Sequence, residues 1–283
     1  MTHQAPASHF HEFAEGLALH YTLHDPQPET NAAKDTLIFI HGSGPGASGW
    51  SNFKHNIAPL QAAGYRCVVF DQWGYGASSK PTDRDHTLAF FVEGLLSLMD
   101  GLDIDRATLV GNSLGGAVAL GTALTHPDRV NKLILMAPGG IESKENYFAM
   151  SGIQEMVKYP MGSPEFDRDV LANLLTLLVY DAAAVDDALI DERWATLQTQ
   201  NPHVLVSMAI PDLTDQLSAI QHPVLVFWGT EDQFCPASGA QKLLEHCNDT
   251  QVVLLNRCGH WVMTEYPALF NRRCVDFLEN GNA

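Results

Sequence analysis

Six short apolar runs alternate with longer amphipathic stretches, and this alternation limits the possible folds more than any other feature of the chain. The runs are TLIFIHG (36–42), RCVVFD (66–71), ATLVG (107–111), KLILMAP (132–138), PVLVFWG (223–229) and QVVLLN (251–256). Nearly continuous apolar runs are typical of parallel strands that are covered on both faces. The stretches between them, such as 87–101 and 115–125, have the pattern of helices. The sequence therefore predicts an α/β protein with a doubly wound, mostly parallel sheet, whose ligands bind beyond the carboxyl ends of the strands.

The alternation stops between about residues 143 and 212. This stretch has no convincing strand pattern, but it contains FDRDVLANLLTLLVY (166–180) and DDALIDERWATLQTQ (186–200), which fit amphipathic helices. We predict a helical lid at 143–211 that is inserted above the strand ends. The core domain then consists of residues 1–142 and 212–283. The alternative is a second helical layer that is unrelated to any site.

Composition and charge exclude several classes of function. The 283 residues are 46% hydrophobic and 17% charged, which is enough to bury a sizeable core. The formal net charge of −17 disfavours nucleic acid or an anionic membrane as a partner, and an anionic substrate then needs a specific local cation. No apolar stretch is long enough to span a membrane and residues 1–20 lack a signal-peptide pattern, so the cytoplasm is the expected location. The five cysteines contain no C-x-x-C pair and indicate neither a disulfide framework nor a zinc site.

One short motif between a predicted strand and a predicted helix points to covalent catalysis. Gly111-Asn112-Ser113-Leu114-Gly115 fits the nucleophile elbow G-x-S-x-G. A serine on so sharp a turn is crowded, and glycine two positions before and after it relieves the crowding. The helix that follows directs its first N–H groups at any negative charge that forms there. Ser113 is therefore the predicted nucleophile, with a glycine-rich turn capped by a serine as the alternative.

A serine hydroxyl is a weak nucleophile and needs a base. His260 in NRCGHWV follows the strand at 251–256, so it is expected at a strand's carboxyl end. His41 also follows a strand, but Gly42 comes next, and we interpret His41 as part of a loop that shapes the backbone. Most other histidines, His86 among them, are expected at the surface or in loops. His260 is therefore the predicted base.

The remaining parts of an acyl-transfer site are also present. Asp232 in WGTEDQFCP is the predicted acid that orients the base, with Glu231 as its rival, and the order serine, aspartate, histidine is that of elbow hydrolases. The predicted oxyanion hole consists of the Leu114 N–H at the helix start and the Ser43 N–H in the glycine-rich loop FIHGSGPGASGW (39–50). No Gly-Lys-Ser/Thr follows this loop, so nucleotide binding is not expected.

Together these segments resemble the meta-cleavage-product hydrolases of the α/β-hydrolase superfamily. The resemblance runs from about residue 15 to residue 279 and depends on HGSGPGASGWSNF, DQWGYGASSK, VGNSLGGAVA, LMAPGG, WGTEDQFCP and CGHWV. It implies an α/β-hydrolase fold with the helical lid inserted after strand 6, the strand at 132–138. It also implies cleavage of the C5–C6 bond of an anionic 2-hydroxy-6-oxo-hexa-2,4-dienoate with no metal or organic cofactor, by a homodimer or higher homo-oligomer.

The resemblance implies a set of substrate-binding residues as well. Arg193, in the lid segment LIDERW, falls where the family places an arginine for the carboxylate and 2-hydroxy end of the substrate. The other predicted members of the pocket or its support are Gly42, Gly44, Asn112, Leu178, Cys258 and Trp261. Leu178 stands where several relatives carry an aromatic residue. The slimmer leucine side chain would enlarge or reshape the pocket for the C6 group. The lid favours a bulky hydrophobic C6 group, unless its apolar side chains only pack against the core; these are Met150, Ile153, Met156, Val157, Leu174, Leu175, Leu178 and Val179.

The implied mechanism has two stages. His260, backed by Asp232, and Ser113 help to convert the dienol to its keto tautomer. Ser113 then attacks the C6 carbonyl, the C5–C6 bond breaks, and water activated by His260 releases the acyl group. A carboxylesterase on the same fold and a non-catalytic small-molecule-binding protein are the alternatives. Arg193 and Trp261 argue against the esterase, and the complete catalytic set argues against the binding protein.

Overall fold

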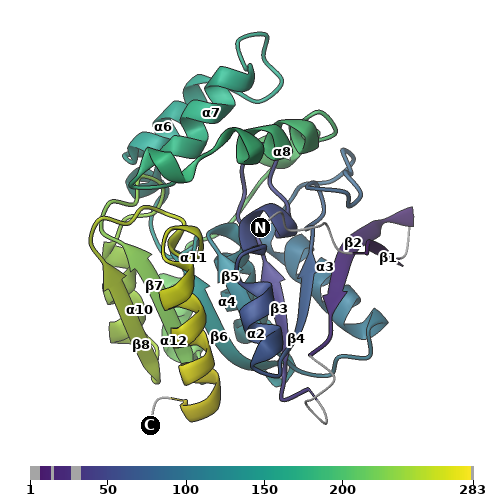
Figure 1. Ribbon diagram of the computed structural model, residues 1–283, viewed down its shortest axis with the longest axis vertical. Coiled ribbons are helices and arrows are strands. Elements are labelled where there is room, and N and C mark those ends of the chain that lie inside the picture. Colours follow the sequence, from purple (N-terminus) through teal and green to yellow (C-terminus); the bar gives the residue numbers. More distant parts are fainter. Residues whose placement is uncertain (1–6, 14–15, 27–32, 282–283) are drawn as a thin grey trace.

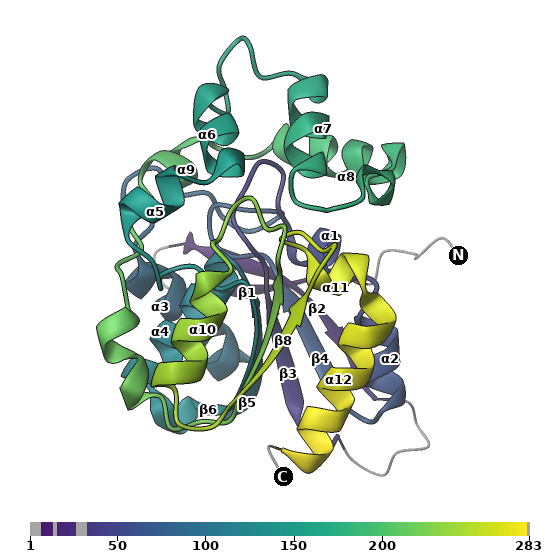
Figure 2. The ribbon, with the colours of Figure 1, turned by 90° about the vertical axis from the view of Figure 1, so that its left-hand side faces the viewer.

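Eight strands of the described chain form one sheet (Figures 1 and 2). The structure is a computed structural model that describes residues 7–13, 16–26 and 33–281. The strands are β1 (His9–Glu12), β2 (Ala18–His24), β3 (Thr36–Ile40), β4 (Arg66–Phe70), β5 (Ala107–Asn112), β6 (Val130–Met136), β7 (Val224–Gly229) and β8 (Thr250–Leu255). Their order is β1-β2-β4-β3-β5-β6-β7-β8, and every pairing from β4 to β8 is parallel. The predicted mostly parallel α/β sheet is confirmed, and the six predicted strands are β3 to β8.

The antiparallel edge formed by β1 and β2 was not predicted from the sequence. β1 pairs with β2, and β2 pairs with β4, both antiparallel. Only Leu19 and Thr22 of β2 are buried, and most of β1 is exposed. These strands therefore lack the continuous apolar pattern that marks the central strands.

Helices cover both faces of the sheet and seal two apolar layers. The helices of the core are α1 (Gly49–Phe53), α2 (Ile57–Ala62), α3 (Leu88–Gly101), α4 (Leu114–Thr125), α10 (Ser238–His246), α11 (Val262–Glu265) and α12 (Pro267–Asn280), with 3₁₀ turns η2 (Pro127–Arg129) and η4 (Thr214–Ala219). Figure 2 shows α3, α4 and α10 on one face and α2 and α12 on the other. One buried cluster lies under each helical layer. Alternate side chains of the buried strands fill the two layers, which is why those strands are apolar throughout.

The segment between β6 and β7 forms a helical cap over the carboxyl ends of the strands (Figures 1 and 2). Its elements are α5 (Lys144–Phe148), α6 (Ser151–Lys158), α7 (Arg168–Thr176), η3 (Ala182–Ala184), α8 (Asp187–Leu197) and α9 (His203–Val206). Side chains cap the two helices that the sequence predicts: Asp167 accepts from Val170 N at 2.9 Å, and Asp186 accepts from Leu189 N at 2.8 Å. The predicted lid after strand 6 is confirmed, while its bounds of 143–211 stay a prediction.

Three properties of the described residues bear on the class of function. None of their helices is long and apolar enough to cross a membrane. All five cysteines are buried thiols. No group of three or more His, Cys, Asp or Glu side chains within the described part could hold a metal ion.

Candidate active site

Ser113 occupies the turn from β5 to α4 in a strained backbone conformation. Its φ of 54° lies in the left-handed region, with ψ at −116°. The glycines of the motif are needed for space: a Cβ atom at Gly115 would overlap the carbonyl oxygen of Ile40, and one at Gly111 would overlap that of Gly115. The Ser113 carbonyl accepts from Gly139 N at 2.8 Å, which helps to hold the turn. The strain is thus maintained by close packing of the strand, the helix and the next loop.

A substitution of Gly115 by alanine tests this crowding. We expect Gly115→Ala to lower the free energy of unfolding by about 3 kcal/mol or more, because the new methyl group would have to displace backbone. Gly121→Ala in the same helix is the matched control, since the atoms nearest to its Cβ would belong to the flexible Leu88 side chain, at 3.1–3.2 Å. Urea denaturation of both variants measures the difference. Equal stability of the two would show that the elbow is not crowded.

His260 is held by a buried carboxylate and by the lid. Its Nδ1–H donates to Asp232 Oδ2 at 2.7 Å, and the two side chains are 3% and 0% exposed. Asp232 Oδ1 accepts from the N–H groups of Phe234 and Cys235 at 2.8 and 2.9 Å, which fixes the orientation of the carboxylate. The rival Glu231 is exposed. This arrangement leaves His260 Nε2 to take up a proton, as a general base must.

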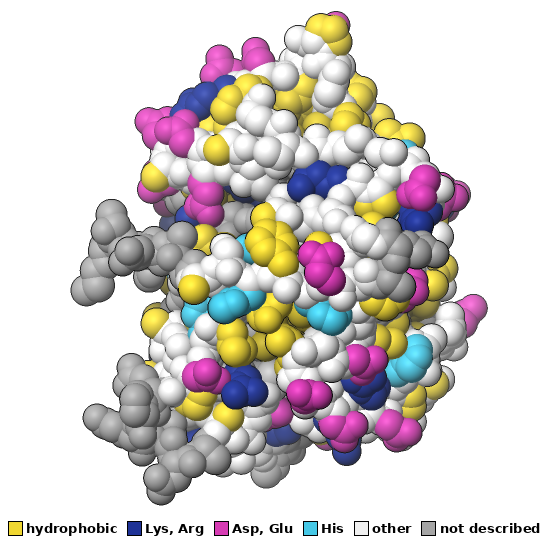
Figure 3. Space-filling view, turned by 90° about the vertical axis from the view of Figure 1, so that its right-hand side faces the viewer, with side chains coloured by type: hydrophobic (Ala, Val, Ile, Leu, Met, Phe, Trp, Pro, Cys, Tyr) yellow, Lys and Arg dark blue, Asp and Glu magenta, His cyan; other side chains and the backbone are white. Residues whose placement is uncertain are grey.

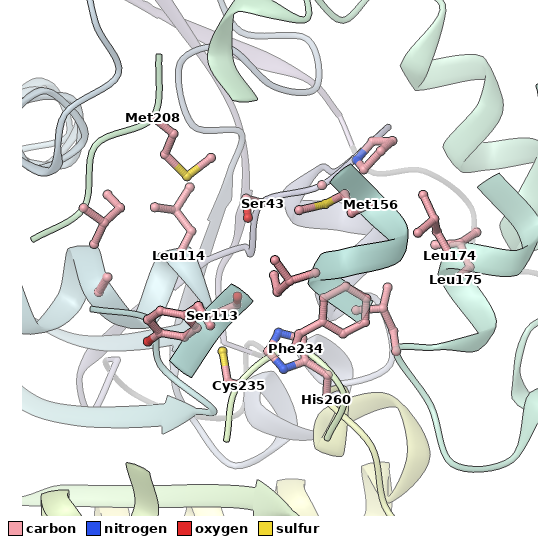
Figure 4. Close-up of a pocket in the computed structure, with 18 of the residues that line it drawn as sticks. Ser43, Ser113, Leu114, Met156, Leu174, Leu175, Met208, Phe234, Cys235 and His260 are labelled. Atoms are coloured by element: carbon pink, nitrogen blue, oxygen red, sulfur yellow. The ribbon is translucent and has the colours of Figure 1, made fainter. Parts of the chain in front are cut away.

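Ser113 and His260 line the same pocket (Figure 4), although no hydrogen bond joins their side chains in the structure. Catalytic hydrogen bonds commonly tighten only when substrate is bound. The thiol of Cys235 lies beside the Ser113 hydroxyl, and burial raises its pKa well above the usual value, so the thiol stays protonated. A neutral thiol adds no charge next to the nucleophile.

Two other histidines have structural surroundings. His41 donates from Nδ1 to Gly42 O at 2.7 Å and accepts at Nε2 from Gln72 N at 3.0 Å. Both ring nitrogens therefore form hydrogen bonds with the backbone, as the sequence indicated. His86 lies in a loop, which is one of the two settings expected for it, but it is fully buried rather than at the surface. Its Nδ1 lies 2.9 Å from Ser207 Oγ, and burial lowers its pKa to about 4. His86 fixes the last part of the lid, after α9, to the core.

The glycine-rich loop after β3 faces the elbow. Ser43 and Gly44 line the pocket, as does Leu114 at the start of α4. A Cβ atom at Gly42 would lie 3.1 Å from Ser113 Cβ, so the loop approaches the nucleophile closely. Neither the Ser43 N–H nor the Leu114 N–H donates a hydrogen bond within the described part of the chain. These are the donors that a tetrahedral oxyanion would need.

A lid residue that the sequence analysis missed holds this loop in place. Gln200 Oε1 accepts from Gly46 N at 2.6 Å, and its Nε2 donates to Gly44 O at 3.4 Å. Gln200 is 8% exposed. No local pattern distinguishes this glutamine from a surface residue, so only the fold reveals its partner.

Arg193 from α8 brings a buried positive charge to the same pocket. It is 2% exposed, its Nη1 donates to Ser51 Oγ at 3.2 Å, and its guanidinium carbon lies 5.4 Å from the Trp261 ring centroid. Burial lowers its pKa to about 10, so it remains charged at neutral pH. Within the described residues no carboxylate forms an ion pair with it, and its Nε has no partner. An unpaired buried cation is costly, so it marks a site for an anionic group.

Three predicted pocket residues lie behind the surface of the cavity. Asn112 is buried and bridges Asn52 Nδ2, at 3.1 Å, and the Met136 carbonyl, at 3.2 Å. Trp261 stacks against Arg193. Cys258 directs its thiol at Glu265 Oε1 at 3.5 Å, and burial raises its pKa. They support residues that line the cavity, whereas Leu178 lines it directly.

The pocket itself has a volume of about 200 Å³ and is mostly apolar. Its walls include several residues that the sequence analysis did not select: Pro45, Ala117, Gly139, Gly140, Tyr147, Leu171, Met208, Ile210, Phe234 and Cys235. Of the lid residues that the sequence marked as apolar, Ile153, Met156, Leu174, Leu175 and Leu178 line it. Phe234 and Cys235 stand two and three positions after Asp232, so their closeness to a predicted catalytic residue along the chain was a signal that could have identified them.

Glu265 links the lid to the loop that carries the base. Its Oε2 accepts from Tyr180 N at 2.7 Å in the lid, and its Oε1 accepts from Gly259 N at 2.6 Å. The Leu178 carbonyl accepts from the N–H groups of His260 and Trp261 at 2.9 and 3.1 Å. The lid segment and the His260 loop are thus joined as one unit.

We expect Glu265→Gln to lower kcat about tenfold, because an amide offers one oxygen where two N–H groups need acceptors. Activity and thermal melting of this variant are compared with those of Ser151→Ala. That control removes a different lid-to-core hydrogen bond, from Ser151 Oγ to Gln233 Oε1 at 2.8 Å. If Glu265→Gln keeps kcat within twofold of the parent, the carboxylate has no part in holding His260.

The fold and the elbow serine, with a carboxylate-held histidine nearby, define the class as an α/β hydrolase. The sequence model of the alpha/beta hydrolase family matches residues 37–273 of this chain. A 2-hydroxy-6-oxo-6-phenylhexa-2,4-dienoate hydrolase of Burkholderia cepacia is 38% identical over 256 residues, which are 87% of this chain and 88% of that protein. A 2-hydroxy-6-oxononadienedioate/2-hydroxy-6-oxononatrienedioate hydrolase of Comamonas testosteroni is 37% identical, with the same coverage of 87% and 88%.

Solved structures agree with these relatives. A meta-cleavage product hydrolase from Pseudomonas fluorescens IP01 matches with a TM-score of 0.80 at 28% identity, over 96% of this chain and 97% of that chain. A membrane phospholipase A has a TM-score of 0.79 at 22% identity, which shows the shared fold alone. The chain therefore belongs to the α/β-hydrolase family and, within it, to the meta-cleavage-product hydrolases, as its sequence motifs indicated.

Proposed function

We propose that the protein hydrolyses the C5–C6 bond of a 2-hydroxy-6-oxo-hexa-2,4-dienoate in the degradation of aromatic compounds. The observation that carries this proposal is Arg193, a buried cation without a carboxylate partner, in the same pocket as Ser113 and His260. A carboxylesterase needs the serine and the histidine but has no use for a buried arginine. The names of the relatives support the same substrate class.

The first stage moves a proton along the dienoate. The Arg193 guanidinium binds the C1 carboxylate and the 2-oxygen in a forked geometry. His260 Nε2 takes the proton of the 2-hydroxyl and delivers it to C5, so that the keto tautomer forms and His260 is neutral again. In this tautomer C5 becomes a carbon leaving group, because its electron pair is delocalised into the 2-oxo group.

The second stage breaks the bond. Ser113 Oγ attacks the C6 carbonyl and gives its proton to His260, and Asp232 stabilises the imidazolium. The N–H groups of Ser43 and Leu114 hold the oxyanion. Collapse of this intermediate breaks the C5–C6 bond, and the leaving fragment takes the proton of the His260 imidazolium to become 2-hydroxypenta-2,4-dienoate, while the acyl group stays on the serine. Water then gives a proton to the neutral His260 as its oxygen attacks the acyl carbon, and His260 returns this proton to Ser113 Oγ as the carboxylic acid leaves.

The test is to mix the purified protein with the yellow dienolate that carries methyl or phenyl at C6. We expect the visible absorbance to disappear and the two products to form in equal amounts. A protein that hydrolyses aryl esters but leaves the dienolate unchanged is the esterase alternative.

Three further properties belong to this proposal. We assign the lid to residues 143–211, the location to the cytoplasm, and the assembly to a homodimer or higher homo-oligomer. Size-exclusion chromatography with light scattering tests the assembly, and cell fractionation tests the location. A monomer at micromolar concentration would contradict the assembly.

A further inference from the structure

Two relatives of nearly equal identity act, by their names, on different C6 groups. One is named for a phenyl group and the other for a dioate, which carries a second carboxylate at the end of the C6 chain. Identities of 38% and 37% do not decide between them. The walls of the pocket provide the chemical distinction.

The wall of the pocket away from Arg193 carries no positive charge. Figure 2 shows α5, α6 and α9 on one side of the lid and α7 and α8, which bears Arg193, on the other. The side chains that line the cavity from the first side form what we call the far wall: Tyr147, Ile153, Met156, Met208 and Ile210. Among the residues that the structure describes, Arg193 is the only lysine or arginine that lines this pocket.

The one polar group of the far wall, the Tyr147 hydroxyl, is uncharged and so offers no counter-charge to a carboxylate. The Tyr147 hydroxyl accepts from Ile141 N at 3.4 Å, and burial raises the pKa of this phenol. A carboxylate placed against the other four side chains would lose its hydration and gain no hydrogen bond. A neutral apolar group loses little hydration there and gains contacts with methionine and isoleucine.

The charge of the lid opposes a second carboxylate as well. Residues 143–211 contain ten acidic and four basic side chains. Figure 3 shows acidic side chains at the surface of the lid, at the top of the view. An anionic C6 chain that extended toward solvent would therefore still approach a negative surface.

We infer that this protein selects dienoates with an uncharged, apolar C6 group and discriminates against dioates. This inference rests on the proposed function, since it assigns the far wall to the C6 group of the same substrate. One buried cation serves one carboxylate, and the second carboxylate of a dioate has no counter-charge in the cavity.

The test compares two substrates of matched shape. One dienoate carries 2-carboxyethyl at C6, and the other carries 3-methylbutyl, in which two methyl groups replace the two carboxylate oxygens. We expect kcat/KM to be about 30-fold or more higher for the neutral substrate, mostly through KM. Equal values for the two substrates would overturn the inference and leave the proposed function intact. Failure to cleave any dienoate, phenyl and methyl included, would overturn the proposed function and the inference with it.

A charge placed on the far wall makes the test specific to this surface. Met208→Lys is expected to reduce the preference at least tenfold, because an ammonium group of similar length would face the distal carboxylate. Met208→Gln, which is polar but uncharged, is the matched control and is expected to leave most of the preference. Ile153→Lys repeats the experiment if Met208→Lys melts much lower than the parent. A preference that neither lysine variant changes would place the C6 group elsewhere and overturn the assignment.

Discussion

Ser113→Ala is expected to reduce the rate of C5–C6 cleavage by at least about 10⁴-fold, because no other group can form the acyl intermediate. Binding of the dienoate is expected to persist, since the Arg193 guanidinium and the apolar walls remain. Mixing the variant with substrate in a stopped-flow instrument measures both binding and cleavage. We expect a spectral change when the dienoate binds, and no formation of products after it.

The matched control is Cys235→Ser, which changes the other nucleophilic side chain beside the elbow. Its cleavage rate is expected to stay within about tenfold of the parent, because its thiol is protonated and takes no proton in the proposed steps. If Ser113→Ala retained a tenth of the activity, or if Cys235→Ser lost as much as Ser113→Ala, the serine would not be the nucleophile.

Arg193→Gln is expected to reduce kcat/KM for the dienoate about 10²- to 10³-fold. A forked ion pair with the C1 carboxylate disappears, and the carboxylate enters a buried site without its counter-charge. Turnover of p-nitrophenyl acetate, a neutral ester, is expected to change less than fivefold, because the serine, histidine and aspartate remain. Arg193→Lys keeps the charge but not the forked geometry. Its kcat/KM for the dienoate is expected to lie between that of the parent and that of Arg193→Gln.

The comparison of the two substrates separates binding of the anion from damage to the site. Arg193 also packs on Trp261 and donates to Ser51, so a collapsed pocket would lower both activities together. Thermal melting of both variants detects such a collapse. Equal losses on the dienoate and the ester in a stable variant would show that the arginine does not recognise the carboxylate.

The central fold and the three proposed catalytic side chains could be predicted because their signals are local. Each buried strand is a continuous apolar run, and Ser113, Asp232 and His260 each follow such a strand within five residues. Parallel strands end at one edge of the sheet, so residues that follow them meet there whatever separates them along the chain. The hydrogen bond of 2.7 Å between His260 and Asp232 is the result. The role of Arg193 came from family resemblance, because one arginine in a helix carries no local signal.

The sequence by itself therefore determined the architecture, the elbow, and the residue types available for covalent chemistry. Only the tertiary structure decided that Asp232 rather than Glu231 meets His260, that Gln200 and Glu265 hold the two loops, and that the far wall carries no charge. The reason is physical: propensity and periodicity depend on neighbours in the chain. A buried hydrogen bond or an unpaired charge instead depends on which distant segments exclude water together.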